Sequence, residues 1–163
     1  MNRAPSRAFD IVEATIADLH AAYEAGTLTV RDAVQAHLDR IAAYDRARPK
    51  LGAIVLTNPD ALADAARLDE HWCKTRMVGP MHGIPVLVKD NYDVAGLQTT
   101  GGSAALLGWV PAKDATVVVK LRAAGAVILA KTTMSEWARG GFDNINSVLP
   151  GFAAARRAAP VRA

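Results

Sequence analysis

The chain has 163 residues, of which 51 % are apolar and 21 % charged, proportions that are ordinary for a globular domain and unlike a disordered chain. Its 19 basic residues only slightly outnumber its 16 acidic ones, and part of the excess lies in Arg156, Arg157 and Arg162. Elsewhere the two signs are mixed, so composition indicates no basic face for direct binding of nucleic acid or of a membrane surface.

Cysteine and histidine usage argues against disulfides and metals. A single cysteine, Cys73, excludes an internal disulfide and argues against a structural zinc site. His71 lies two residues before it, a spacing that means little alone, so neither a metal nor a cofactor is expected. The first ten residues carry no apolar core of a signal peptide, and charges interrupt the most apolar region, 117–130. We therefore expect a cytoplasmic protein that does not enter a membrane.

Two helices are predicted between Phe9 and Tyr44, where apolar residues recur at helical spacing. Gly26 is placed to end the first helix. Thr29 is placed to cap the second, with Asp32 three residues further on. This pattern predicts an N-terminal αα-hairpin.

Strands then alternate with helices, a pattern typical of an α/β layer with parallel strand pairing. Both faces of the second strand are apolar, which fits a strand covered by helices on each side. We expect Asp114 to cap the last long helix and Gly125 to end it. The predicted elements are a strand within 51–60 with a turn at Asn58-Pro59, a helix over 60–72, a strand over 84–89, a glycine-punctuated loop over 90–108, a helix over 114–124, a strand over 126–130 and a short helix around 134–139.

Lysines stand at the ends of two of these strands. In open α/β sheets ligands bind beyond the carboxyl ends of strands, where Lys89-Asp90 and Lys131-Thr132-Thr133 are expected. The ammonium group of such a lysine can simply reach water while its stem packs on apolar neighbours. Alternatively, partial desolvation lowers its pKa and lets the neutral amine act as a general base. The strand alone leaves both interpretations open.

The surrounding motifs favour the second interpretation. The segments "GPMHGIPVLVKDNYDVAGLQTTGGSAAL" and "DATVVVKLRAAGAVILAKTTMSEWA" resemble, in order, the amidase signature family of serine hydrolases. That family carries its catalytic lysine in a Gly-Pro-x-His-Gly-Ile-Pro-x-x-x-Lys-Asp segment. A Thr-Thr-x-Gly-Ser loop, a helix, a Gly-Ala-x-Ile-x-x-Lys-Thr strand and a Met-Ser-Glu segment follow. The resemblance extends from about residue 9 to about Phe152.

The resemblance implies a large mixed sheet wrapped in helices, and a Ser–cisSer–Lys triad that cleaves the carbon–nitrogen bond of a small amide. The lysine maps onto Lys89, which would take a proton through a bridging serine and so activate the nucleophilic serine. Glycine-rich backbone N–H groups would form the oxyanion hole. Thr132, Thr133 and Met134 could line the acyl pocket or simply pack, and Asp90 could orient the lysine or form a turn. Lys131 is interpreted as structural.

Neither serine of that triad is found here. The family places them in a Gly-Gly-Ser-Ser-Gly-Gly stretch and a later Gly-Gly-Ser, which this chain lacks. Gly101-Gly102-Ser103 matches the Thr-Thr-x-Gly-Ser element instead, and a tight turn is its expected role. Ser135 and Ser147 have no partner base that can be named. The three tryptophans, Trp72, Trp109 and Trp137, are expected to be packing residues.

The resemblance divides the chain into a partial amidase signature domain, 1–152, and an Ala/Arg-rich tail, 153–163. A tail of this composition fits a shifted reading frame or truncation; the rival interpretation is a genuine disordered end. Because the family's later strands are absent, we expect the apolar surfaces of 84–88 and 126–130 to stay exposed beside an open strand edge.

The function expected is therefore that of an amidase-type hydrolase, represented by an N-terminal portion that is inactive alone. One alternative is the A subunit of the glutamyl-tRNA(Gln) amidotransferase, which shares the signature and works with partner subunits. Another is a non-catalytic remnant or binding fragment. A nucleotide-binding module lacks support, because no Gly-x-Gly-x-x-Gly follows a strand.

Overall fold

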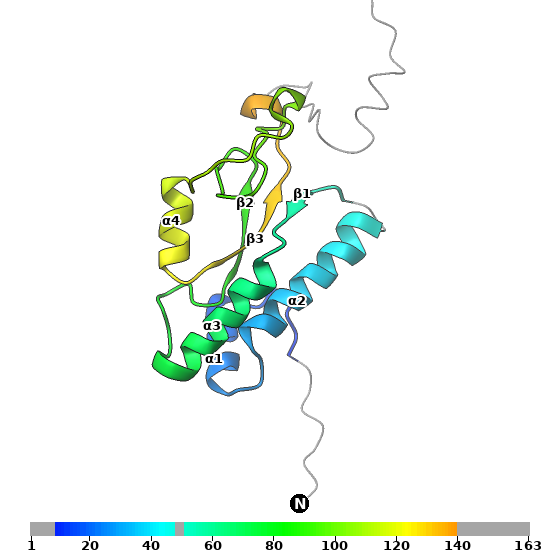
Figure 1. Cartoon of the computed structure of the whole chain (residues 1–163). Coiled ribbons are helices and arrows are strands. Elements are labelled where there is room, and N and C mark those ends of the chain that lie inside the picture. Colours follow the sequence, from blue (N-terminus) through cyan, green and yellow to red (C-terminus); the bar gives the residue numbers. More distant parts are fainter. Residues whose placement is uncertain (1–8, 48–50, 140–163) are drawn as a thin grey trace, which may run out of the picture.

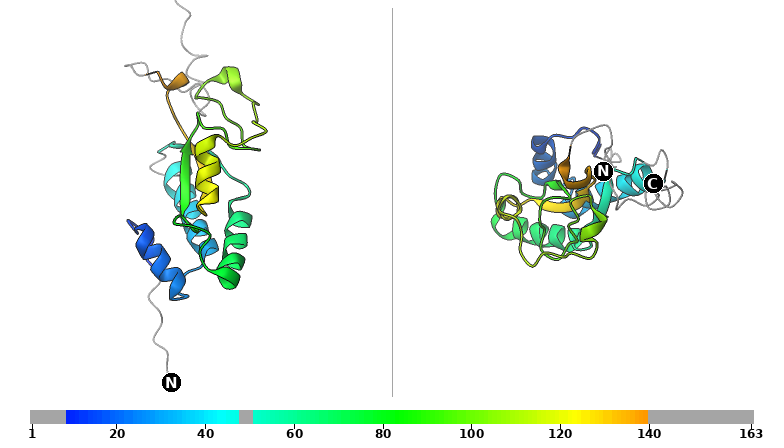
Figure 2. Two further views of the ribbon diagram at one scale, coloured as in Figure 1. Left: turned by 90° about the vertical axis from the view of Figure 1, so that its left-hand side faces the viewer. Right: turned by 90° about the horizontal axis from the view of Figure 1, so that it is seen from above.

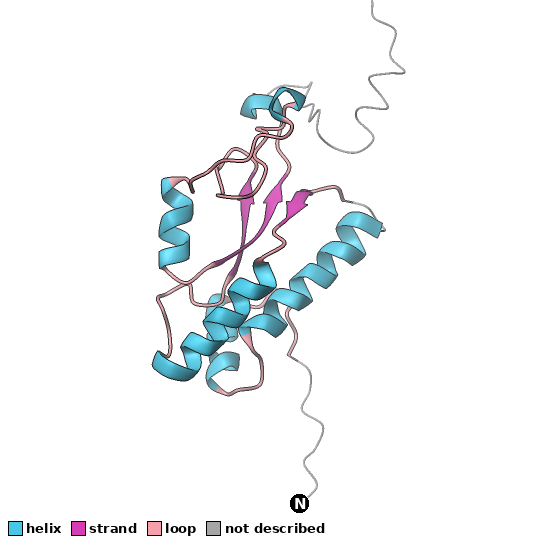
Figure 3. Cartoon of the chain, in the orientation of Figure 1, coloured by secondary structure: helices cyan, strands magenta, loops and turns pink. Residues whose placement is uncertain are grey.

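The strand that comes last in the described chain lies at the centre of the sheet. The structure is a computed structural model that describes residues 9–47 and 51–139, and it places helices on both faces of a three-stranded sheet (Figures 1 and 3). In chain order the elements are α1 (Ile16–Glu24), α2 (Val30–Arg40), the π-helical segment η1 (Ile41–Ala47), β1 (Ile54–Thr57), α3 (Ala61–Thr75), β2 (Pro85–Lys89), the 3₁₀ turn η2 (Ala104–Leu106), α4 (Thr116–Ala123), β3 (Val127–Thr132) and the 3₁₀ turn η3 (Glu136–Ala138).

The sheet is mixed, as the resemblance implied, with the strand order β1-β3-β2. Strand β2 runs parallel to β3, whereas β1 runs antiparallel to it, so the expected parallel pairing is confirmed for β2 and wrong for β1. Asn58, directly after β1, continues this antiparallel pairing. Its side-chain amide donates to the Ile128 carbonyl at 2.7 Å and its backbone N–H to the Leu129 carbonyl at 2.9 Å. These bonds hold the exit of β1 beside the middle of β3.

Alternate residues of β3 fill two separate cores. Val127 and Leu129 join the core that α1, α2 and α3 cover, whereas Ile128 joins the core under α4. Figure 2 shows α4, in yellow, alongside the strands. All three side chains are at most 2 % exposed, and each such burial stabilises the fold by about 1.5–3 kcal/mol. The expectation that 126–130 stay exposed is wrong, because side chains on both faces of β3 pack into cores. For 84–88 it is right only in part, since Leu87 is 47 % exposed whereas Ile84 and Val88 are 7 % and 5 % exposed.

The helix termini follow the sequence signals with one exception. Thr29 and Asp32 form the predicted reciprocal capping box of α2, and Gly26 takes a positive φ of 63° just past α1. Asp114 does not cap α4, since Ala115 is the N-cap and no side chain bonds there. The Asp114 carboxylate instead pairs with Arg122 Nε at 3.0 Å and accepts the Ala95 N–H at 2.7 Å.

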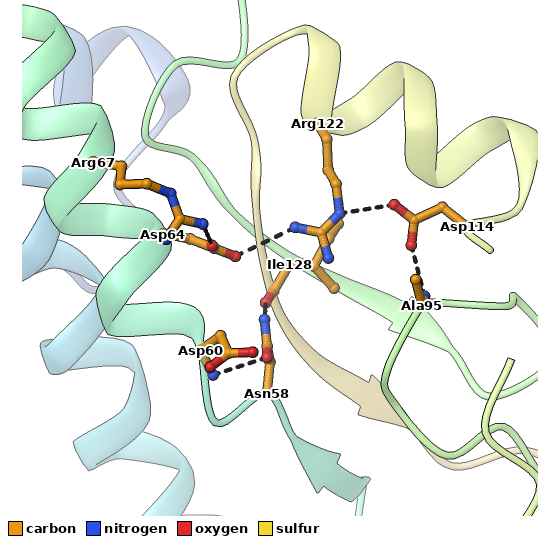
Figure 4. A network of polar contacts seen from close by, with 8 residues as sticks. All are labelled: Asn58, Asp60, Asp64, Arg67, Ala95, Asp114, Arg122 and Ile128. Atoms are coloured by element: carbon orange, nitrogen blue, oxygen red, sulfur yellow. Dashed lines mark hydrogen bonds and ion pairs between the residues drawn. The ribbon is translucent and has the colours of Figure 1, made fainter. Parts of the chain in front are cut away.

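Arg122 joins α3, α4 and the loop after β2 through this polar network, which Figure 4 shows together with Asn58. Its guanidinium contacts Asp114 from one side and Asp64 of α3, at 3.3 Å, from the other. Asp64 also pairs with Arg67 one turn along its own helix. A single arginine therefore stands between two partly buried carboxylates.

The segment that leads into β2 packs against several helices through His82. This side chain is fully buried, its Nδ1 accepts the Val78 N–H at 3.1 Å, and its Nε2 lacks a partner among the described residues. Burial, the nearby His71 and His20 together lower the pKa of His82, against a smaller opposing effect of Asp69. The imidazole is therefore held neutral, because accepting at Nδ1 requires that nitrogen to be unprotonated.

Candidate active site

The carboxyl ends of β2 and β3 meet at one end of the sheet, where the predicted site residues come together. Lys89, the last residue of β2, is the register partner of Thr132, the last residue of β3. The loops that follow both strands rise from this same end, at the top of Figure 1. A parallel pair brings such strand ends together as a matter of topology.

Lys89 lies on the open face of the sheet. Side chains alternate along a strand, so Lys89 and Leu87 point away from the buried Val88 and Asp90. Leu87 forms part of an apolar hollow of 490 Å³ between the sheet and the C-terminal part of α2. Its lining comprises His37, Arg40, Ile41, Tyr44, Asp45, Leu51, Ala53, Ile54, Pro85, Leu87 and Leu129. Lys89, two residues after Leu87, is exposed.

Lys131 is the lysine that the described chain encloses. It lies within β3 rather than after it, and its side chain is 0 % exposed. Its Nζ lies 3.2 Å from Asp90 Oδ1 and donates to Thr99 Oγ1 at 2.7 Å. Burial lowers the pKa of Lys131, and the Asp90 carboxylate opposes that shift. Asp90 thus faces Lys131 and not Lys89.

The three predicted substrate-lining residues have separate surroundings. Thr132 and Thr133 are half-buried at the end of β3, and the Thr133 N–H donates to the Ala53 carbonyl at 2.8 Å. Met134 is 7 % exposed and lines a cavity of 250 Å³ beyond the strand ends. Its lining comprises Asn91, Asp93, Thr99, Gly101, Leu106, Trp109, Met134, Trp137 and Ala138.

Two of the three tryptophans were assigned wrongly. Trp72 packs on His82 with the ring centroids 5.4 Å apart, as expected of a packing residue. Trp109 and Trp137 are 54 % and 59 % exposed and lie at the 250 Å³ cavity. Trp137 has a left-handed backbone (φ 55°, ψ 25°), a conformation that costs a non-glycine residue about 1–3 kcal/mol.

Ser103 occupies a turn, as the sequence predicted. Gly101 and Gly102 have positive φ values of 59° and 74°, and a Cβ on Gly102 would lie 2.8 Å from the Met134 carbonyl oxygen. The Ser103 hydroxyl donates to Glu136 Oε1 at 2.5 Å and is 2 % exposed. It therefore joins the two loops above the sheet.

The sequence is similar to those of known amidases. The model of the family Amidase matches residues 32–149, more than half of the chain, and the chain belongs to this family. It is 44 % identical to the A subunit of the glutamyl-tRNA(Gln) amidotransferase of Alkaliphilus metalliredigens, over 80 % of this chain and 26 % of that protein. A probable amidase of Arabidopsis thaliana is also 44 % identical, over 82 % of this chain and 26 % of the relative.

A solved structure shows the same fold. The native peptide amidase of Stenotrophomonas maltophilia superposes with a TM-score of 0.74 at 50 % identity, over 77 % of this chain and 26 % of that one. The chain thus spans about a quarter of the length of the relatives that it matches. The tail 153–163 and Ser147 lie outside the described residues.

The described residues contain neither a helix that could span a membrane nor a cluster of side chains that could bind a metal ion. None of the helices within 9–47 and 51–139 has the length and apolar character needed to cross a bilayer. The same ranges place no three His, Cys, Asp or Glu side chains so that they could hold a metal ion. His71 instead hydrogen-bonds to Thr75 of its own helix, and Cys73 is exposed.

Proposed function

We propose that the chain is the N-terminal portion of an enzyme that hydrolyses an amide bond, with Lys89 as the general base of a Ser–cisSer–Lys triad. Both serines would lie in the remaining three quarters of the relatives' length, which this chain does not cover. The observation that carries the proposal is the place of Lys89, at the carboxyl end of β2 and exposed on the open face of the sheet.

In this mechanism Lys89 takes a proton from the bridging serine, which in turn takes the proton of the nucleophile. The nucleophile attacks the amide carbonyl, the amine leaves with a proton, and water releases the acyl group from the enzyme. The open face beside Lys89 supports this proposal, because the serines need access to the lysine amine from outside the described residues. The acyl pocket would include Met134, together with Thr132 and Thr133 at the strand end.

Complementation tests the proposal. The chain is produced with the C-terminal three quarters of the Stenotrophomonas maltophilia peptide amidase, and ammonia release from a peptide amide is measured. We expect no turnover from the chain alone and measurable turnover from the complemented pair. Lys89→Met should then reduce the rate at least about 10²-fold, the usual contribution of a general base. Lys120→Met, on the exposed side of α4, is the matched control and should have no effect. Unchanged turnover with Lys89→Met would refute the assignment.

A second candidate is the A subunit of a glutamyl-tRNA(Gln) amidotransferase. It is favoured by the 44 % identity to that protein from Alkaliphilus metalliredigens. Under this alternative the same lysine would act within an assembly with partner subunits. Copurification of the chain with those subunits distinguishes the two candidates, whereas binding of the peptide amidase complement alone supports the first.

A further inference from the structure

The buried ion pair between Lys131 and Asp90 needs a physical explanation. Both side chains are 0 % exposed, and removing two charges from water costs several kcal/mol per ion. An apolar pair of similar volume is often as stable as a buried ion pair, or more so. Stability alone therefore does not account for these two charges at the end of the sheet.

The contacts of the pair lead to a single loop, Thr99–Ser103. Asp90 Oδ2 accepts from the Thr100 N–H at 3.2 Å and from the Thr100 hydroxyl, and the Asp90 carbonyl accepts the Gly101 N–H at 3.0 Å. Lys131 reaches the neighbouring Thr99 hydroxyl at 2.7 Å. The Thr100 hydroxyl oxygen in turn accepts the Gly102 N–H at 3.2 Å. No pair of apolar side chains could make these bonds, because they require acceptors and donors at the same point.

The same two residues border Lys89. Asp90 directly follows it, and the Asp90 N–H donates to the Thr132 carbonyl at 3.1 Å. Thr132 directly follows Lys131 and is the register partner of Lys89. The Lys89 carbonyl accepts the Tyr92 N–H at 3.0 Å. Displacement of the pair would therefore be transmitted to the backbone on both sides of Lys89.

We propose that the Lys131–Asp90 pair is a positioning device, which holds the loop Thr99–Ser103 on the strand ends and so fixes the backbone that presents Lys89. The role assigned to Lys89 rests on the proposed function, whereas the locking of the loop does not. Lys131 acts here through Asp90 and the loop, and it is a positioning residue rather than a catalytic one. A buried charge pair is retained because it determines geometry at this end of the sheet.

Amide hydrogen exchange of the whole chain, followed by ¹⁵N–¹H NMR, tests the proposal. Lys131→Met keeps the length and the apolar stem of the side chain but removes its charge. We expect exchange at the amides of Thr100, Gly101 and Gly102 to accelerate at least about tenfold relative to the amides of α2, since local opening follows local loss of contacts. Ile128→Val, which trims a buried residue of the same strand, is the matched control and should leave that ratio unchanged.

Asp90→Asn provides a second variant if Lys131→Met does not fold. It keeps an oxygen acceptor for Thr100 but removes the charge that Lys131 needs, and it should accelerate the same loop amides. Acceleration confined to the loop supports the proposal. Equal acceleration at all amides, or none at the loop, in a folded variant would overturn it. Lys89→Met should leave loop exchange unchanged, so failure of the proposed function and failure of this inference are measured separately.

Discussion

Gly125 is a position at which a single added methyl group should be damaging. It follows α4 with a φ of 93°, and a Cβ there would lie 2.8 Å from the Cα and 3.1 Å from the N of His82. Both contacts are with backbone atoms, which cannot rotate away. Gly26 follows α1 with a φ of 63°, and a Cβ there meets nothing within 4 Å. The two glycines thus share a role at a helix end and differ in the space around them.

The magnitude follows from this comparison. The left-handed conformation costs alanine about 1–2 kcal/mol at either site. Alanine also lowers the conformational entropy of the unfolded chain, which stabilises the folded state by about 0.4–1 kcal/mol in both variants. Overpacking against the His82 backbone adds about 1–3 kcal/mol at Gly125 alone. We therefore expect Gly26→Ala to lower the free energy of unfolding by about 0–1.6 kcal/mol, and Gly125→Ala by about 1–3 kcal/mol more than that.

Urea unfolding at neutral pH, followed by far-ultraviolet circular dichroism, measures this difference. The midpoint of Gly125→Ala should fall well below that of Gly26→Ala while the slope of the transition stays the same. Equal midpoints for the two variants would refute the reasoning. They would show that the backbone at His82 shifts to make room for the added methyl group at low energetic cost.

Two further predictions concern charge. Because the folded chain holds the pKa of His82 below its ordinary 6.5, the unfolded chain binds more protons in this range. The free energy of unfolding should thus be highest above pH 6.5 and decline as the pH falls through the folded pKa of His82. In His82→Gln, urea unfolding should show a weaker dependence of this free energy on pH. An equal pH dependence in the variant and the unmodified chain would contradict the prediction. Arg122→Met leaves Asp114 partly buried without its cation and Asp64 with Arg67 alone, and it should cost about 1–3 kcal/mol of unfolding free energy. The exposed Arg67→Met should cost under about 1 kcal/mol, and a reversed order in urea unfolding would disprove the bridging role.

Local signals in the sequence were sufficient for most of the helices and strands. The capping box of Thr29 and Asp32 formed because both partners lie within one helical turn. Asp114 carries the same kind of signal, but Arg122 and the Ala95 N–H compete for its carboxylate. Asp114 therefore does not cap α4, and its actual partners could not be predicted from the neighbouring sequence.

Pairings between distant segments could not be derived in the same way. The motif resemblance placed Lys89 at a strand end, and the structure agrees with that placement. The antiparallel pairing of β1 with β3 joins segments far apart in the chain, as does the bond from Asn58 to Ile128. Likewise, the partner of Lys131 is Asp90 on another strand end, and only the parallel register of β2 and β3 brings them together. Partial desolvation was expected for Lys89, which is exposed, whereas Lys131, interpreted as structural, is the buried lysine.

The central place of β3 has a consequence for synthesis on the ribosome. Strands β1 and β2 are both paired through β3 in the described sheet, so neither has its neighbour until residues 127–132 have been made. The helices α1, α2 and α3 can form beforehand from local contacts. The described sheet forms only when β3 pairs with β1 on one edge and with β2 on the other. A nascent chain stalled before Val127 would therefore expose both edges at once. Chaperone binding to this nascent chain should be strongest just before β3 emerges.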